Sequence, residues 1–143
     1  MNIESIKNGI VIDHIKPGKS MDIYRLLRLE SLDCSVALIK NVPSQRMGKK
    51  DIVKIDCDLE FDFDVIGYID SGVTVNVIKN GEIIEKRSAE LPAKLTNVIF
   101  CKNPRCISQT EQELPHIFML TNRENGVYRC MYCETRAKNN DLL

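Results

Sequence analysis

The sequence predicts an α+β fold in the first two thirds of the chain and a small all-β domain in the last third. Two observations lead to this prediction. Residues 1–92 alternate β-branched runs with helical apolar patterns, and residues 93–143 hold four closely spaced cysteines. With 143 residues, 43% of them hydrophobic and 28% charged, the chain has the composition of a globular protein with a packed core.

The first strand and the first helix are expected close together. Residues 9–15 are nearly all β-branched, and Pro17-Gly18 ends that run. Ser20 is the expected N-cap of a helix that continues to about Glu30, because an apolar stripe with helical spacing follows it. The stripe consists of Ile23, Leu26, Leu27 and Leu29.

Four more strands and a second helix complete the first part. Residues 36–42 and 51–55 have the composition of strands, and residues 43–48 that of a loop. Residues 59–69 predict a helix, although Gly67 disfavours one. Residues 73–78 and 82–86 predict a hairpin, because Asn80-Gly81 readily takes the two positive φ angles of a type I′ turn. This order predicts a mainly antiparallel sheet with both helices on one face, a ferredoxin-like arrangement.

The four clustered cysteines predict a metal site. Four residues separate Cys101 from Cys106, two separate Cys130 from Cys133, and 23 residues separate the pairs. Four thiolates in two tight knuckles suit tetrahedral zinc, which needs no redox partner. The sequence does not exclude a single iron ion of the rubredoxin type as the alternative. Four protein ligands close the coordination shell, so we expect one structural Zn²⁺ per chain rather than a catalytic one.

The segment between the cysteine pairs predicts a second hairpin, over residues 116–121 and 127–131, and hence a rubredoxin-like zinc ribbon. The alternatives are disulfides, a thioredoxin-like redox pair of Cys130 and Cys133, or unrelated core thiols. Cys34 and Cys57 are expected to be small core residues, and His116 an ordinary loop or strand residue.

Charge and hydropathy exclude two classes of protein. The 20 Lys plus Arg balance the 20 Asp plus Glu, which argues against a general binder of nucleic-acid phosphates. The chain has no run of 18 apolar residues, and Glu4, Lys7 and Asp13 interrupt its start. We therefore expect a cytoplasmic protein without a membrane anchor.

Basic residues on the predicted strands indicate an anion site, although neither common phosphate-binding loop motif is present. Lys50 and Lys54 point to one face of their strand, and Lys86 lies on the adjacent hairpin. Asp13 can accept ribose hydroxyls and His14 can donate to phosphate, provided that a strand end or a bulge brings these neighbours to one side. The alternative is that these lysines are solvated or protect a sheet edge.

Six short stretches carry a resemblance to a known family. They are residues 6–15 (IKNGIVIDHI), 41–44 (NVPS), 47–51 (MGKKD), 74–76 (TVN), 91–92 (LP) and 130–134 (CMYCE). With these motifs, nearly the whole chain resembles the regulatory chain of bacterial and archaeal aspartate carbamoyltransferase. The resemblance implies a non-catalytic chain of pyrimidine biosynthesis, with an effector-binding domain at 1–92 and a structural zinc domain at 93–143.

The resemblance also implies an effector pocket that binds CTP as inhibitor and ATP as activator. Lys54 would contact base and ribose, Asp13 the ribose, and His14 and Lys86 the phosphates. Gly81 stands where well-known relatives carry a Tyr beside the base. The implied pocket comprises the first residues from Ile3 to Ile6, together with Ile12, Asp13, His14, Lys50, Lys54, Asn76, Ile78, Ile83 and Lys86.

The partner implied by the resemblance is the catalytic chain of the enzyme, on which the zinc domain would dock. Asn103 matches a contact to that chain, whereas Arg105 replaces an Asn. Two regulatory chains would pair through their N-terminal domains, and three such pairs would bridge two catalytic trimers. The alternative function is a zinc-ribbon nucleic-acid adaptor. A small independent enzyme is disfavoured because the two histidines lie far apart in the sequence and the clustered cysteines are better explained by a metal.

Overall fold

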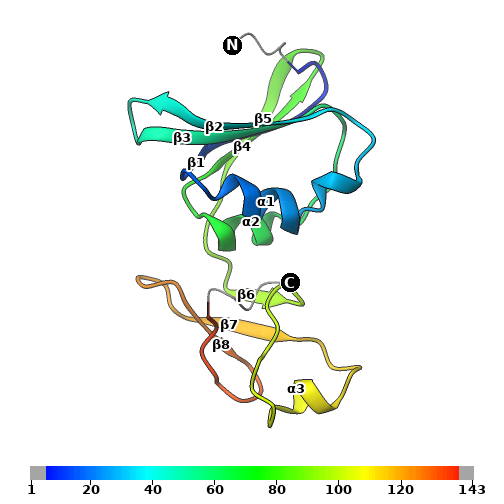
Figure 1. Ribbon diagram of the computed structural model, residues 1–143, viewed down its shortest axis with the longest axis vertical. Coiled ribbons are helices and arrows are strands. Elements are labelled where there is room, and N and C mark those ends of the chain that lie inside the picture. The colour runs from blue at the N-terminus through cyan, green and yellow to red at the C-terminus, as the bar shows by residue number, and fades with distance from the viewer. Residues whose placement is uncertain (1–5, 139–143) are drawn as a thin grey trace. The chain divides into compact units, whose positions relative to one another are not determined.

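The computed structural model describes residues 6–138, and the chain divides into two compact units, Met1–Glu90 and Leu91–Leu143 (Figure 1). The first unit holds a five-stranded antiparallel sheet with the strand order β2-β3-β1-β4-β5. Its strands are β1 (Gly9–Ile15), β2 (Val36–Ser44), β3 (Gly48–Ile55), β4 (Thr74–Lys79) and β5 (Glu82–Ser88).

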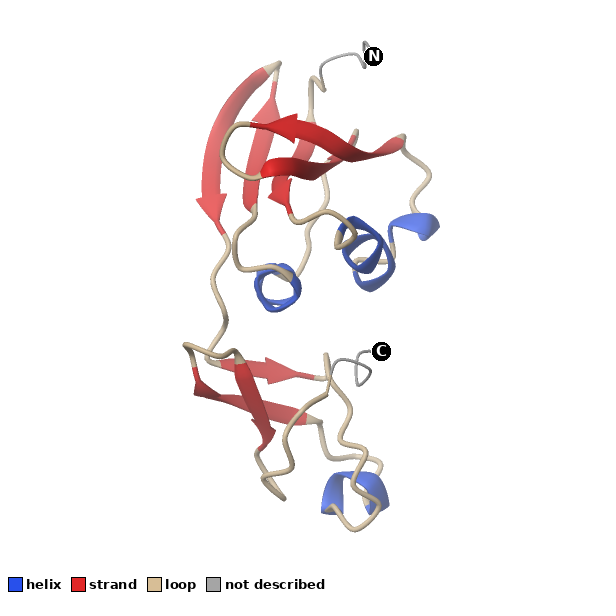
Figure 2. Ribbon diagram, turned by 60° about the vertical axis from the view of Figure 1, so that its left-hand side comes forward, coloured by secondary structure: helices blue, strands red, loops and turns tan. Residues whose placement is uncertain are grey.

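Both helices of the first unit, α1 (Ser20–Leu26) and α2 (Phe63–Ile69), cover the same face of the sheet (Figures 1 and 2). The order from β1 to β4 is strand, helix, two strands, helix, strand, and β5 adds a fifth strand beside β4. This is the predicted ferredoxin-like arrangement. In the described part of the first unit, residues 6–90, no helix lies on the opposite face of the sheet (Figure 2).

The core of the first unit lies between the sheet and its helices. Alternate residues of the central strands, such as Ile10 and Ile12 on β1 and Val53 and Ile55 on β3, are almost fully buried. Ile23 of α1 packs into the same cluster. Because side chains alternate along a strand, the residues between them point to the opposite, open face.

Helix α1 differs from its prediction at both ends. Its N-cap is Lys19 rather than Ser20, which is fully buried and donates its hydroxyl to Asp51 Oδ2 at 2.6 Å. The helix ends at Leu26, and a separate 3₁₀ turn, η1 (Leu29–Ser31), follows. Arg28 between them has a φ of 53°, which breaks the helix predicted to reach Glu30.

Helix α2 is shorter than predicted. It begins at Phe63 rather than near Leu59, because the Asp62 side chain accepts the N–H of Asp64 and caps the first turn. Gly67 lies inside the helix despite its low propensity. A Cβ at this position would collide with the backbone carbonyl oxygen of Glu90, so only glycine lets the two segments approach this closely.

Strands β2 and β3 are longer than predicted and enclose only a three-residue turn, residues 45–47. Pro43 and Ser44 therefore lie in a strand instead of the expected loop. Proline is compatible with this place because β2 is an edge strand and needs no N–H for a further neighbour. The β4–β5 hairpin is confirmed, with φ values of 53° at Asn80 and 79° at Gly81.

The second unit holds a three-stranded antiparallel sheet of β6 (Lys94–Thr96), β7 (Ile117–Asn122) and β8 (Val127–Cys130), and a short helix, α3 (Ile107–Thr110). The predicted hairpin is confirmed as β7–β8, whereas β6 was not expected from the sequence. No helix within residues 6–138 has both the length and the hydropathy needed to span a membrane.

Candidate metal centre and polar sheet face

The four predicted metal ligands come together in the second unit. The sulfur atoms of Cys101, Cys106, Cys130 and Cys133 all lie within 4.8 Å of one another. The first pair lies around the start of α3, while Cys130 ends β8 and Cys133 lies in the turn that follows. Among residues 6–138 this is the one group of three or more potential ligands.

The spacing of the sulfur atoms fits a tetrahedral metal ion. Cys101 Sγ lies 3.6 Å from Cys133 Sγ, and Cys106 Sγ lies 3.7 Å from Cys130 Sγ. A tetrahedron with metal–sulfur bonds of 2.3 Å has edges of about 3.8 Å. Three of the four cysteines are buried and the fourth half-buried, so the protein can hold an ion away from water. The donor set is that of a structural site with a closed shell.

Neighbouring polar groups fix the orientation of the ligands. The N–H of Cys101 donates to Nδ1 of His116 at 3.2 Å, and the side-chain amide of Gln109 donates to the carbonyl of Cys101. The hydroxyl of Ser108 lies 3.0 Å from Cys106 Sγ. His116 is therefore not one of the four ligands but a positioning residue for the first knuckle, a role that the sequence alone did not indicate.

The protonation of the cysteines differs across the centre. Burial raises the pKa of Cys101 to about 12 and also raises the pKa of Cys130. Burial acts in the same direction on Cys133, but hydrogen bonds with Thr135 and Asn103 outweigh it and lower its pKa to about 6. Cys133 thus offers a thiolate near neutral pH, while a cation must displace protons from Cys101 and Cys130.

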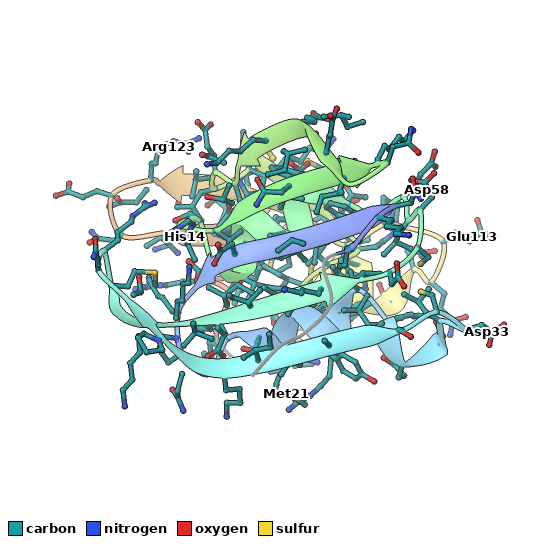
Figure 3. All side chains as sticks on the ribbon, turned by 90° about the horizontal axis from the view of Figure 1, so that it is seen from above. His14, Met21, Asp33, Asp58, Glu113 and Arg123 are labelled. Atoms are coloured by element: carbon teal, nitrogen blue, oxygen red, sulfur yellow. The ribbon has the colours of Figure 1, made fainter. Side chains whose placement is uncertain are left out.

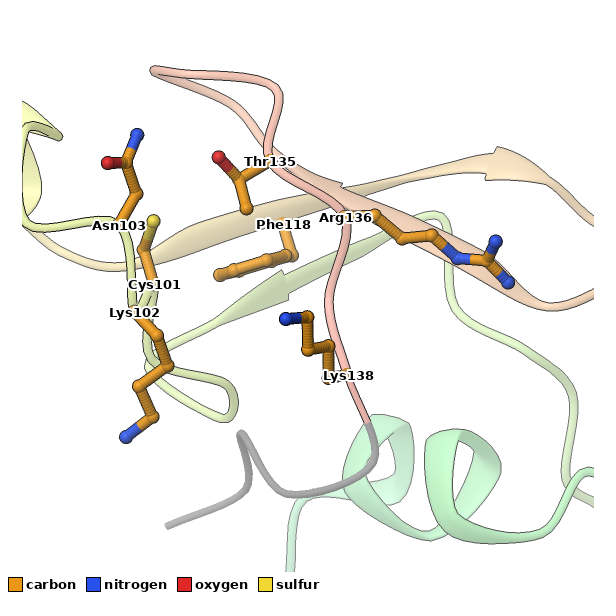
Figure 4. Close-up of a pocket in the computed structure, with 7 residues that line it drawn as sticks. All are labelled: Cys101, Lys102, Asn103, Phe118, Thr135, Arg136 and Lys138. Atoms are coloured by element: carbon orange, nitrogen blue, oxygen red, sulfur yellow. The ribbon is translucent and has the colours of Figure 1, made fainter.

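An open hollow of about 540 Å³ lies beside the first knuckle (Figure 4). Phe118 lies within the hollow, and Asn103 and Thr135 lie near the sulfur of Cys101. The remaining lining is basic, from Lys102, Arg136 and Lys138. The lining of the hollow thus includes one aromatic and three basic residues, together with Cys101 of the four-cysteine cluster.

The open face of the first unit gathers the basic residues predicted to bind an anion. Lys54 on β3 lies opposite Val11 on β1, Val11 opposite Asn76 on β4, and Asn76 opposite Lys86 on β5. Opposite residues of antiparallel strands point to the same face, so this row crosses four strands over about 14 Å. A hollow of about 380 Å³ lies beside Lys54, between β2 and β3.

A bulge near the end of β1 shapes one side of this face. The register of β1 against β3 shifts between Ile12 and Ile15, and His14 has a φ of 59°. The bulge is the condition under which Asp13 and His14 can serve one ligand. Asp13 forms an ion pair of 3.0 Å with Lys50, so these two residues lie together (Figure 3 labels His14 on this face).

Two buried polar atoms on this part of the sheet have no partner within residues 6–138. They are Nδ1 of His14 and Oδ1 of Asn76. An unsatisfied buried polar group costs about 1–3 kcal/mol, and most such groups in folded proteins are paired. Both atoms belong to residues that the sequence analysis placed in the implied effector pocket, and each can form a hydrogen bond with a ligand.

The apolar residues of the predicted pocket do not all lie on the open face. Ile78 on β4 and Ile83 on β5 lie opposite each other at the hairpin end of the open face. Ile6 precedes β1, and the neighbouring Lys7 accepts the N–H of Gly81 at its carbonyl oxygen, at 2.9 Å. Ile12 is fully buried in the core, so its side chain does not reach this face. Ile3 lies outside the described residues.

The sequence analysis did not identify one buried carboxylate, which lies on the core side of β3. Asp51 is fully buried and accepts hydrogen bonds from the hydroxyl of Ser20 and the N–H groups of Gly18 and Asn41. Burial raises its pKa, but these hydrogen bonds and Lys40 outweigh burial and lower it. Asn41 has a φ of 60° at a bulge in β2, so Asp51 joins this bulge to the loop after β1 and to the first residue of α1.

Comparison with known proteins gives two matches to family models. Residues 1–90 match the allosteric domain of the aspartate carbamoyltransferase regulatory chain, and residues 93–143 match its metal binding domain. Together these models cover almost the entire chain.

Curated relatives agree with the family models. The aspartate carbamoyltransferase regulatory chain of Clostridium botulinum strain Hall is 49% identical over 142 residues, covering 99% of this chain and 97% of the relative. That of Clostridium tetani is 49% identical over 135 residues, 94% of each chain. That of Bifidobacterium longum is 41% identical over 138 residues, 96% of this chain and 99% of the relative.

The matches span both units, and the four-cysteine centre lies in the part that matches the metal binding domain. The sequence-based resemblance is thereby confirmed. The chain belongs to the aspartate carbamoyltransferase regulatory chain family, and it is a non-catalytic regulatory chain with an allosteric domain and a metal-binding domain.

Proposed function

We propose that the open sheet face binds a nucleoside triphosphate, CTP as inhibitor and ATP as activator, and that the metal domain transmits the binding to the catalytic chain. The effector domain would comprise residues 1–92 and the metal domain residues 93–143. The observation that carries the proposal is the pair of orphaned atoms, His14 Nδ1 and Asn76 Oδ1, among Lys50, Lys54 and Lys86.

The roles of the residues follow from their chemistry. Lys86 and His14 can donate to phosphate oxygens, and the carboxylate of Asp13 can accept ribose hydroxyls. Oδ1 of Asn76 accepts a hydrogen bond, so it suits an amino or hydroxyl group of the nucleoside. Lys54 lies in the same row and would contact base and ribose.

The apolar part of the pocket would come from Ile6, Ile78 and Ile83, at the hairpin end of the face. Ile12 would take part through its backbone only, because its side chain is fully buried. Gly81 likewise offers a backbone contact, and no side chain there restricts the base.

Calorimetric titration of CTP and ATP into the full chain tests this binding. We expect saturable heat for the wild type and at least tenfold weaker binding for Lys54→Ala, a loss of about 1.4 kcal/mol. Lys49→Ala is the matched control, because Lys49 lies on the same strand at an exposed position pointing to the other side. Absence of heat with the wild type, or equal loss in both variants, would reject the proposal.

We propose further that the metal is a single structural Zn²⁺. Four thiolates at this spacing suit a tetrahedral ion with a closed shell, and zinc is preferred to iron because it needs no redox partner. When bound, zinc would cross-link the two knuckles, and no step of catalysis would involve it. Elemental analysis should find one zinc per chain, and stoichiometric iron in its place would refute the choice of ion.

The partner of a regulatory chain is a catalytic chain, and we propose that the metal domain docks on it near Asn103. Three regulatory dimers would bridge two catalytic trimers, with a coupling free energy between the sites of about 1–3 kcal/mol. Cys130→Ser should abolish co-elution with the catalytic chain while leaving the heat of CTP binding intact. Retained co-elution would contradict the role of the metal domain.

A further inference from the structure

Two cysteines outside the metal centre face each other at the end of the β2–β3 pairing. The ladder runs to the pair of Val36 and Ile55, and one more hydrogen bond extends it, from the N–H of Asp56 to the carbonyl of Ser35 at 2.9 Å. Cys34 and Cys57 come one residue further out, at bends just beyond the two strands, where the same register would place them opposite each other. The backbone thus aligns two thiols that are 23 positions apart in the sequence.

The position is the kind at which a disulfide fits. Because Ser35 and Asp56 share the last ladder hydrogen bond, a continued register would give Cys34 and Cys57 a non-hydrogen-bonded position, at which the Cα atoms of a regular sheet are about 4.5 Å apart. Disulfides span Cα distances of about 4.4–6.8 Å. Both side chains share the face of Val36 and Ile55, pack against the core and are half-buried.

Cys34 also influences the protonation of Cys57. A hydrogen bond with Cys34 is the largest cause of the raised pKa of Cys57, about 11, and burial and the nearby Asp56 and Asp58 add to it. The pair is no metal site of the usual kind, because within residues 6–138 no third ligand joins it. A pair of adjacent thiols without a metal has one common covalent chemistry, which is disulfide formation.

We propose that Cys34 and Cys57 form a reversible disulfide by exchange with a low-molecular-weight disulfide, as a modification site separate from the metal centre. One thiolate attacks the small disulfide, releases one small thiolate and leaves a mixed disulfide. The second thiolate then attacks the protein-bound sulfur and releases the second small thiolate. Two protein thiols are oxidised, one small disulfide is reduced to two thiols, and the two protons pass to the released thiolates.

The bond would join the two ends of the β2–β3 hairpin, which carries Lys50 and Lys54. The chain between the two cysteines would become a closed loop that includes both strands. The disulfide would therefore oppose separation of the edge strand β2 from the sheet, and a reducing agent would reverse this effect.

The test uses the full metal-bound chain with glutathione disulfide under native conditions. We expect a mass loss of two hydrogens, a peptide that links Cys34 to Cys57, and full reversal by dithiothreitol. Metal content per chain should stay constant, which separates this site from Cys101 and its partners. The test does not depend on effector binding.

Cys34→Ser and Cys57→Ser are matched variants, since each leaves one thiol of the pair. Each should stop at the mixed disulfide and gain the mass of one glutathione. Two results with the wild type would overturn the proposal. One is that both cysteines remain open to alkylation after oxidation, and the other is that either of them links to a metal-site cysteine instead.

Discussion

Each of the two units of this chain is stabilised in a different way. The first unit has a sheet of five strands, two helices and a cluster of eleven almost fully buried apolar residues. The second has three short strands, one short helix and long irregular segments around four cysteines. In the first unit many contacts contribute to stability, whereas in the second we expect the free energy of folding to depend on the ion that the four cysteines can hold.

Removal of the metal is the most severe test of this difference. Chelation, or the substitution Cys130→Ser, should unfold the second unit, because structural zinc contributes on the order of 10–16 kcal/mol of apparent binding free energy in small modules. Residue-resolved NMR should show loss of the amide signals of β6, β7 and β8 and retention of those of β1 to β5. Cys57→Ser, which removes a cysteine outside the centre, should leave both sets in place. Simultaneous loss of both sets would mean that the units do not fold separately.

Gly67→Ala should destabilise the first unit. Helix propensity alone predicts a gain of about 1 kcal/mol, but the new Cβ would collide with the backbone of Glu90. We expect net destabilisation by about 1–3 kcal/mol. Urea unfolding, followed by signals of the first unit, measures it. An increase in stability would show that the helix and the Glu90 segment separate easily.

Asp51→Asn should weaken the attachment of three segments to β3. The amide keeps the volume of the carboxylate but cannot accept all three hydrogen bonds with the same strength. A loss of about 1–3 kcal/mol is expected, with metal content unchanged. Asp22→Asn is a suitable control, because Asp22 lies in the first turn of α1 outside this network.

Acid should reduce the stability of the first unit through the same group. The pKa of Asp51 in the folded state lies below its ordinary value of 3.8, so the folded state favours the charged form. The contribution of Asp51 is thus fully present above about pH 4 and is lost as the pH falls below that value. Unfolding measured at neutral pH and at about pH 3 should show a smaller difference for Asp51→Asn than for the wild type. An equal difference in both proteins would contradict this role.

Arg87→Gln should have the smallest effect. The guanidinium carbon of Arg87 lies 4.1 Å from the centre of the Phe63 ring, and the side chain is half exposed. An exposed cation–π contact contributes about 0.5–1 kcal/mol. Glu85→Gln separates this contact from the 3.7 Å ion pair of Arg87, which should contribute less. A larger effect of Glu85→Gln would reverse this ranking.

Features that depend on neighbouring residues could be predicted from the sequence. The Asn80-Gly81 turn has the two positive φ angles that its residue types favour. The spacing of the four cysteines was enough to identify the cluster, because two short knuckles bring their own ligands together. The bulge at Asp13 and His14 was recognised as a condition for a shared site, and the structure has it.

Features that depend on residues far apart in the sequence could not be predicted in this way. Ser20 has the side chain of an N-cap, but its hydroxyl bonds to a carboxylate 31 residues away. Asp51 in turn has no local signal, since all its partners lie in other segments. The use of Gly67 depends on the backbone at Glu90, and that of His116 on the backbone N–H of Cys101. Only the three-dimensional fold brings these groups into contact.

Strand β8 has a double role that restricts how its sequence can change. Cys130 pairs with Phe118 in the sheet and also contributes one of the four sulfur atoms. A shift of β8 by one residue would turn that sulfur to the other side of the sheet. Insertions and deletions should therefore be tolerated in the exposed turn at residues 123–126 and excluded from Val127–Cys130. The requirement to keep Cys130 in the cluster thus fixes the length and register of β8. Homologous chains should differ in the length of the turn but not in the length of this strand.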